Sequence, residues 1–315
     1  MRQALPRRAF PLRRAFLLRR MFLLRRAFLL RRAFLLRRTL PVLALCGALL
    51  SAGTAARATV PPPVSGRTFS YGSHARQTLT AYGDRSAHRP VLVVLHGGYW
   101  SRDTDWSRWA RWFAARGFTV YDTDYRLTSD AVWPAQRDDV LAALRWVRRH
   151  HGGARPLVLG SSAGGHLAVS AATYGAGRSR VRGVAALSPV ASPHRAWVDG
   201  ARPGASAERR ALRRAAVRLA GCAPDRDGRR CRERWDDLAA ASHASGADDA
   251  PMFLTHTDGD FVPVRHSAEL ADVERGSGQR DITVRTVRGS SAHGMGLLEE
   301  SGVAKSVLRW LRAHA

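Results

Sequence analysis

The sequence is poor in lysine throughout and contains no acidic residue near its start. Lys305 is the only lysine, so arginine supplies almost all of the 51 basic residues. Residues 1–58 hold 14 arginines and no Asp or Glu, which accounts for more than half of the net charge of +26. The remaining excess is scattered beside Asp and Glu instead of gathered in one basic stretch. This distribution argues against a nucleic-acid partner, although a basic surface still affects solubility and surface association.

The chain also lacks an apolar run long enough to cross a bilayer. Its most apolar stretch near the start, residues 40–50, has about 11 residues, whereas a transmembrane helix needs about 20. Five near-copies of an Arg-Arg-x-Phe-Leu-Leu hexapeptide precede this stretch over residues 7–36, and Ala56-Arg57-Ala58 follows it. A basic region, a short apolar stretch and a small-x-small site predict a secretory signal peptide cut after Ala58.

The predicted signal peptide, residues 1–58, implies an exported protein. Its arginine pairs resemble twin-arginine export signals, so we expect the export machinery as a partner and an extracellular location. We expect no stable membrane insertion of the mature chain.

Cysteine is scarce, with three residues in the whole chain. Cys46 leaves with the signal peptide, and Cys222 and Cys231 remain as a pair in an oxidising compartment. We therefore predict a disulfide between them, with two free buried thiols as the alternative. No cluster of His and Cys lies near them in the sequence, so we expect no metal site.

After a proline-rich linker at residues 59–66, apolar runs alternate with helical patterns over residues 67–315. This alternation predicts an α/β domain with a mostly parallel sheet and helices on both faces. The first two strands should be antiparallel. The expected strands are residues 68–71, 77–82, 90–95, 118–121, 157–159, 184–187, 252–254 and 282–284, and the expected helices are residues 106–116, 135–151, 163–174, 265–275 and 297–312.

Residues 193–250 interrupt the alternation, because they are rich in Ala and Arg and contain no clear strand pattern. We predict a helical cap inserted over the carboxyl edge of the sheet, where open α/β sheets bind their ligands. Such a cap would shape the substrate pocket.

The segment Gly160-Ser161-Ser162-Ala163-Gly164 follows one apolar run and precedes a helical pattern. Strand, sharp turn and helix is the context in which G-x-S-x-G exposes a serine hydroxyl. Glycines are needed in such a crowded turn, since a Cβ would clash. The pattern also arises by chance, so the assignment of Ser162 as a nucleophile depends on its neighbours.

A serine hydroxyl needs a base to take its proton, and the base needs a third group to orient it. His293 and Asp260 each follow a predicted strand, at the sheet edge where the elbow lies. We therefore predict a catalytic triad of Ser162, His293 and Asp260. Asp258 is an alternative for the acid.

The most apolar strand is followed by His96-Gly97-Gly98-Tyr99-Trp100. Glycines let backbone N–H groups approach a developing oxyanion with no side chain in between. We predict an oxyanion hole from the N–H groups of Gly98, Tyr99 and Ala163, and we expect His96 to brace the loop. A plain Gly-Gly turn is the alternative.

Residues 96–100, 124–127, 133–135 and 160–168 resemble motifs of the α/β-hydrolase fold. The resemblance extends over about residues 66–315. It is most specific to the carboxylesterase, hormone-sensitive-lipase-like and kynurenine-formamidase-like branches. It implies the chain order Ser, acid, His and a reaction that needs no metal or organic cofactor.

These features together predict a secreted serine hydrolase that cleaves small-molecule carboxylic esters through an acyl-enzyme. One alternative is an arylformamidase. Tyr99 stands where the hormone-sensitive-lipase branch usually has a third glycine, and within the resemblance it favours the formamidase-like and secreted esterase branches. Another is a non-catalytic binding protein of the same fold. Such proteins usually lose a triad member, whereas this chain keeps all three.

Overall fold

A computed structural model describes residues 66–86 and 88–315 of the chain. The predicted signal peptide, residues 1–58, lies outside the described residues, as does the predicted linker except for Gly66. No helix within the described ranges is long and apolar enough to cross a membrane.

The core of the protein is an eight-stranded sheet with the strand order β1-β2-β4-β3-β5-β6-β7-β8. β1 and β2 pair antiparallel, and β2 also pairs antiparallel with β4, whereas all other neighbours are parallel. The strands are β1 (Arg67–Ser70), β2 (Thr78–Tyr82), β3 (Val91–Leu95), β4 (Thr119–Thr123), β5 (Leu157–Ser161), β6 (Gly183–Leu187), β7 (Met252–Thr257) and β8 (Ile282–Val287). The predicted mostly parallel sheet with an antiparallel start is confirmed.

Helices cover both faces of this sheet, which explains why the central strand β3 is apolar at every position. Val93 and Leu95 of β3 pack in one apolar cluster, to which α3 (Ala135–His150), α4 (Ala163–Thr173) and α9 (Arg265–Gly276) contribute. Leu92 and Val94 point the other way, into a cluster with α2 (Ser107–Ala114) and α10 (Val303–Ala313). All five residues of β3 are buried.

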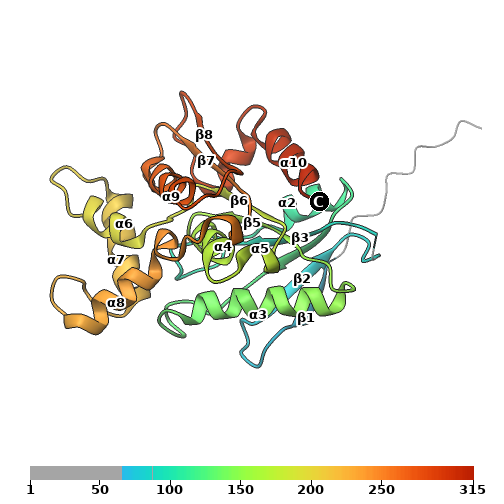
Figure 1. Ribbon diagram of the computed structural model, residues 1–315, viewed down its shortest axis with the longest axis horizontal. Coiled ribbons are helices and arrows are strands. Elements are labelled where there is room, and N and C mark those ends of the chain that lie inside the picture. Colours follow the sequence, from blue (N-terminus) through green and yellow to red (C-terminus); the bar gives the residue numbers. More distant parts are fainter. Residues whose placement is uncertain (1–65, 87) are drawn as a thin grey trace, which may run out of the picture. The chain divides into compact units, whose positions relative to one another are not determined.

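Residues 193–250, all of them described, contain helices and no strand. They form α6 (Pro193–Asp199), α7 (Ala207–Ala220), α8 (Gly228–Leu238) and the short 3₁₀ helices η1 (Ala240–His243) and η2 (Gly246–Asp248). Figure 1 shows α6, α7 and α8 grouped together beside the sheet. Arg209 of α7 donates a hydrogen bond to the carbonyl oxygen of Phe261, at 3.2 Å, in the loop after β7. A disulfide joins Cys222 and Cys231.

One predicted helix differs from the structure, and one observed helix is not predicted. The single helix expected over residues 297–312 is wrong: η3 (Gly294–Glu299) ends, and α10 begins at Val303. Between them Glu300 is extended and Gly302 has a φ of 74°, a left-handed conformation that suits glycine and interrupts the helix. The short helix α5 (Gly177–Arg180) is not apparent in the sequence pattern.

Candidate active site

Ser162 lies on a strained elbow between β5 and α4. Its φ of 54° and ψ of −113° are rare for a residue with a side chain. The turn is also crowded, because a Cβ on Gly164 would lie 2.2 Å from the Leu95 carbonyl oxygen, and one on Gly160 would lie 2.3 Å from the Gly164 carbonyl oxygen. The glycines of the elbow are therefore explained by close backbone contacts. Such strain persists only where the surrounding structure imposes it, and it concentrates at functional sites.

The side chains of Ser162, His293 and Asp260 form one continuous chain of hydrogen bonds. His293 Nε2 lies 2.8 Å from Ser162 Oγ, and His293 Nδ1 lies 2.8 Å from Asp260 Oδ1. Because the carboxylate can only accept, Nδ1 carries a proton and Nε2 is left as the acceptor for the serine hydroxyl. The residues come from the ends of β5, β7 and β8, whose parallel directions bring the three loops together.

The loop after β7 distinguishes between the two candidate acids. The Asp260 side chain is fully buried, and its Oδ1 also accepts a bond from Val262 N at 2.9 Å. Asp258 instead accepts from the backbone N–H groups of Gly289 and Ser290, and these bonds lower its pKa. Asp260, not Asp258, therefore lies against the histidine.

His256 shapes the same loop from inside the protein. Burial lowers its pKa to about 4, so the ring is neutral near pH 7. Nδ1 donates to the Val262 carbonyl oxygen at 3.0 Å, and Nε2 lies 2.7 Å from Ser267 Oγ. The ring therefore ties α9 to the turn that presents Asp260.

The loop after β3 presents backbone N–H groups beside the nucleophile. Gly98 has a φ of 99°, and Tyr99 and Trp100 also have positive φ values. The Gly98 carbonyl oxygen turns away and accepts from Ser101 N and Arg102 N. Within residues 66–86 and 88–315, the N–H groups of Gly98 and Tyr99 have no protein acceptor. Ala163 is the first residue of α4, where N–H groups have no intrahelical partner. The three predicted donors are thus free for a ligand oxygen.

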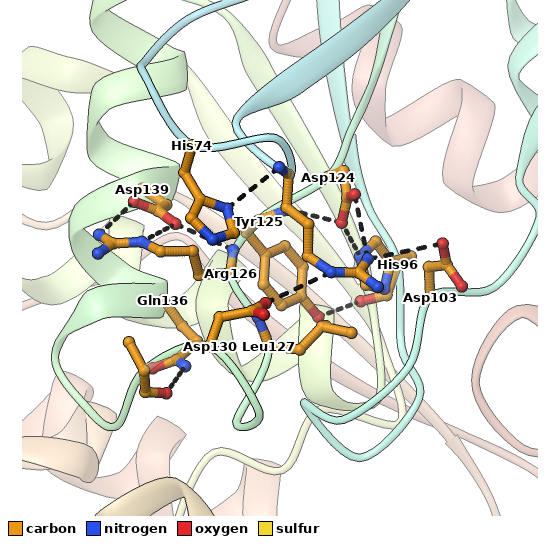
Figure 2. A network of polar contacts seen from close by, with 12 residues as sticks. His74, His96, Asp103, Asp124, Tyr125, Arg126, Leu127, Asp130, Gln136 and Asp139 are labelled. Carbon is orange, nitrogen blue, oxygen red and sulfur yellow. Dashed lines mark hydrogen bonds and ion pairs between the residues drawn. The ribbon is translucent and has the colours of Figure 1, made fainter.

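His96 braces this loop and does not contact Ser162. Its ring nitrogens lie 2.8 Å from the Gly97 carbonyl oxygen and 3.1 Å from Asp124 Oδ1. The ring stacks on Tyr125, whose hydroxyl donates to the His96 carbonyl oxygen at 2.8 Å. Figure 2 shows this cluster within a wider polar network. Arg76 extends the network by pairing with Asp124 at 3.3 Å.

Another buried histidine, His166, connects the same loop to α8. Its Nδ1 accepts from Trp100 Nε1 at 3.2 Å, so Nε2 carries the proton and donates to the Leu238 carbonyl oxygen at 2.8 Å. Burial lowers the pKa of His166 to about 4, which keeps the ring neutral. No sequence signal apart from the elbow motif identifies this residue.

A pocket of about 340 Å³ is lined by both Ser162 and His293. The pocket is lined by the loop after β3 and by aromatic and flexible apolar side chains. The lining residues include Gly98, Tyr99, Ser162, Phe261, His293 and Met295. The rings of Tyr99 and Phe261 lie nearly parallel, with centroids 6.2 Å apart. The pocket therefore places apolar surfaces beside Ser162, which is typical of ligand pockets.

The chain resembles solved esterase structures over most of its length. Esterase B from Lactobacillus Rhamnosis (HN001) superposes with a TM-score of 0.62 at 24% identity, covering 81% of this chain and 86% of that one. An acetyl ester-xyloside bifunctional hydrolase from Caldicellulosiruptor lactoaceticus gives 0.63 at 21% identity, covering 80% and 98%. A thermophilic esterase from Thermogutta terrifontis gives 0.57 at 20%, covering 80% and 91%. The protein has the α/β-hydrolase fold.

A family model points the same way. The BD-FAE family consists of α/β hydrolases. Its model matches residues 81–185 of this chain. That segment runs from β2 through β6 and contains both the oxyanion loop and the elbow. The resemblance found in the sequence is therefore confirmed at the level of the fold.

One group of potential metal ligands occurs among the described residues. Cys222, Asp227 and Cys231 bring their ligand atoms within 4.8 Å of one another. The two sulfur atoms are bonded to each other in the disulfide, so they are not free to bind a metal.

Proposed function

We propose that this protein is a serine hydrolase that cleaves carboxylic ester bonds through an acyl-enzyme. The observation that carries the proposal is the hydrogen-bonded chain from Ser162 through His293 to Asp260, beside three backbone N–H groups without protein acceptors. Esterases with the same fold support the ester class.

In the proposed reaction, Ser162 Oγ attacks the carbonyl carbon while His293 Nε2 takes the hydroxyl proton. Asp260 accepts the Nδ1–H bond and stabilises the imidazolium. The N–H groups of Gly98, Tyr99 and Ala163 stabilise the negative charge on the carbonyl oxygen. His293 then protonates the departing alcohol, and a water molecule hydrolyses the acyl-enzyme by the same steps.

The test replaces the nucleophile in the mature protein. Ser162→Ala should lower kcat for p-nitrophenyl acetate by roughly 10⁴- to 10⁶-fold, since removing a triad member leaves only binding and oxyanion stabilisation. It should also abolish labelling by a fluorophosphonate probe. The neighbouring Ser161→Ala variant is a labelling control, because the hydrogen bond of His293 Nε2 goes to Ser162 Oγ and not to Ser161. Retained turnover in Ser162→Ala would disprove the mechanism.

The same assay separates the alternative activities. An arylformamidase would turn over N-formylkynurenine faster than p-nitrophenyl acetate. A non-catalytic binding protein would show neither turnover nor labelling at Ser162.

We also propose that the protein is exported, with residues 1–58 as its signal peptide. The Cys222–Cys231 disulfide supports this proposal, because such bonds persist in oxidising compartments and are rare in the cytosol of mesophiles. The redox state of these two cysteines in the protein recovered from cells provides the test.

A further inference from the structure

Ser188, the residue directly after β6, has a backbone conformation that needs an explanation. Its φ is 51°, although it has a side chain and precedes a proline, and such residues favour extended conformations. It is completely buried. A strained residue of this kind persists only where its surroundings over-determine it.

The Ser188 hydroxyl lies between the loops that present Asp260 and His293. Gly294 follows His293 in the chain, and its backbone N–H donates a hydrogen bond to Ser188 Oγ at 2.9 Å. A backbone N–H can only donate, so the hydroxyl accepts this bond and has its own proton left to give. Ser188 Oγ donates that proton to Asp260 Oδ2. One hydroxyl thus connects the acid to the loop of the base.

The backbone around Ser188 also holds the nucleophile. Ser162 N donates to the Leu187 carbonyl oxygen at 2.8 Å, and Ser188 N donates to the Thr255 carbonyl oxygen at 2.8 Å. The end of β6 therefore contacts the elbow after β5 and the end of β7. Thr257 also connects the two loops, because its carbonyl oxygen accepts from Asp260 N at 3.5 Å and its hydroxyl donates to the Ala292 carbonyl oxygen at 2.9 Å. The Ser188 hydroxyl differs in that it bonds the Asp260 carboxylate itself.

We propose that Ser188 is a positioning residue for the triad: its hydroxyl fixes the Asp260 carboxylate and the His293 loop in the geometry that the reaction requires. The inference rests on the proposed serine-hydrolase function and deepens it. Ser188 does not line the pocket, so it acts through Asp260 and His293 and not through substrate contact.

The Ser188 hydroxyl has a specific electrostatic effect on the pair formed by Asp260 and His293. Asp260 Oδ1 is held by Val262 N and His293 Nδ1, whereas Ser188 supplies the bond to Oδ2. A bond to Oδ2 draws negative charge from the carboxylate. Without it the carboxylate attracts the imidazolium more strongly. Among the described residues, the neutral ring of His256 and the Tyr99 hydroxyl also interact electrostatically with Asp260.

The experiment compares Ser188→Ala with Ser188→Gly in the mature protein. Both variants lack the hydroxyl, but glycine adopts a φ of 51° without strain and alanine does not. We expect both to lower kcat by about 10- to 100-fold, the range of a positioning contact to a catalytic group, with KM changed less than threefold. The acidic limb of the kcat/KM profile should move to higher pH.

Ser170→Ala is the matched control. Ser170 is equally buried, donates one bond to the His166 carbonyl oxygen at 2.9 Å, and does not line the pocket. It should keep wild-type kcat and the wild-type pH profile. Thermal unfolding of each variant checks folding, and Ser188→Gly keeps the test open if the alanine variant fails to fold.

Several outcomes would overturn the proposal. Wild-type kcat in Ser188→Gly would mean that only the backbone conformation matters. A loss of kcat with no shift in the acidic limb of the kcat/KM profile would mean that Ser188 has a structural role and does not affect the Asp260–His293 pair. If instead Ser162→Ala retains activity, the proposed function itself fails, and that result is distinct from either of these.

Discussion

At the scale of single residues, the chemistry of this site depends on backbone conformations that the sequence signals only through glycine. The pattern Gly97-Gly98 predicts a loop whose N–H groups face inward, and the positive φ of Gly98 agrees with it. Tyr99, Ser162 and Ser188 have positive φ values without being glycine. No residue-type preference indicates those conformations, because tertiary contacts impose them.

Gly98 offers a sharp test of the oxyanion loop. A Cβ there would lie 2.0 Å from the Arg102 carbonyl oxygen, and a φ of 99° is unfavourable for alanine. Gly98→Ala should therefore displace the N–H donors and lower kcat for p-nitrophenyl acetate by about 10²- to 10³-fold, the cost of losing an oxyanion donor.

Gly117→Ala is the control for this substitution. Its φ of 98° is almost the same, but a Cβ there meets nothing within 4 Å, and Gly117 does not line the pocket. This variant should lose some stability and keep its kcat. Equal losses of kcat in both variants would show that backbone strain alone explains the effect.

At the scale of helices and strands, the central elements follow from the sequence almost to the residue. Apolar runs predict β3 and β6 within one residue, because burial on both faces requires apolar side chains at every position. β7 and β8 each extend three residues beyond the prediction. Their polar ends, such as Thr255-His256-Thr257, pair in register within the sheet, which a hydrophobicity pattern does not detect.

Part of the candidate site is also predictable from the sequence. The residues that the sequence indicated, Ser162, Asp260 and His293, come from strand ends that the fold brings together. Ser188 and His166 were not singled out, since their roles arise from contacts between segments far apart in the chain. A serine after a strand is common, and only its neighbours give it a role.

The disulfide lies within the helical segment formed by residues 193–250. Cys222 and Cys231 are nine residues apart and join the turn after α7 to α8. Closing a loop of this size stabilises the folded state by about 2–3 kcal/mol in the chain-entropy model. The Cys222→Ala/Cys231→Ala double variant should therefore unfold at a lower temperature, while kcat well below that temperature stays within about twofold.

Two further measurements check the disulfide. The exported protein, denatured without reductant, should show no titratable thiol. Reductant should lower the unfolding temperature of the wild type to that of the double variant and leave the double variant unchanged. Two free thiols in the exported protein would contradict both the disulfide and the proposed compartment.

At the scale of the whole molecule, buried titratable groups set the pH range in which the fold is stable. Burial lowers the pKa values of His166 and His256 to about 4 and that of His266 to about 3. Between those values and about 6.5, the unfolded chain binds more protons than the folded one, so stability falls as the pH drops below 6.5. These residues lie against the oxyanion loop, the acid loop and the cap, so acid should weaken the site together with the fold.

Glu274 of α9 has the opposite effect. Burial, and secondarily the charge of Asp249, raises its pKa to about 8. The folded chain therefore binds more protons than the unfolded chain between pH 4.5 and about 8, and stability falls as the pH rises through this range. Burial also raises the pKa of Asp122 to about 7, with the same sign. With three histidines opposing two carboxyl groups below pH 6.5, the unfolding temperature should be highest near that pH.

Glu274→Gln tests this balance, because glutamine keeps the shape and removes the titration. The variant should lose less stability than the wild type between pH 6.5 and 9, as measured by thermal unfolding at several pH values. The fall in the unfolding temperature of this variant below pH 6.5, which the histidines control, should be the same as in the wild type. Asp272→Asn on the same helix removes an exposed carboxylate and should leave the whole profile as in the wild type. An alkaline limb equally steep in Glu274→Gln would show that Glu274 is already ionised in the folded protein.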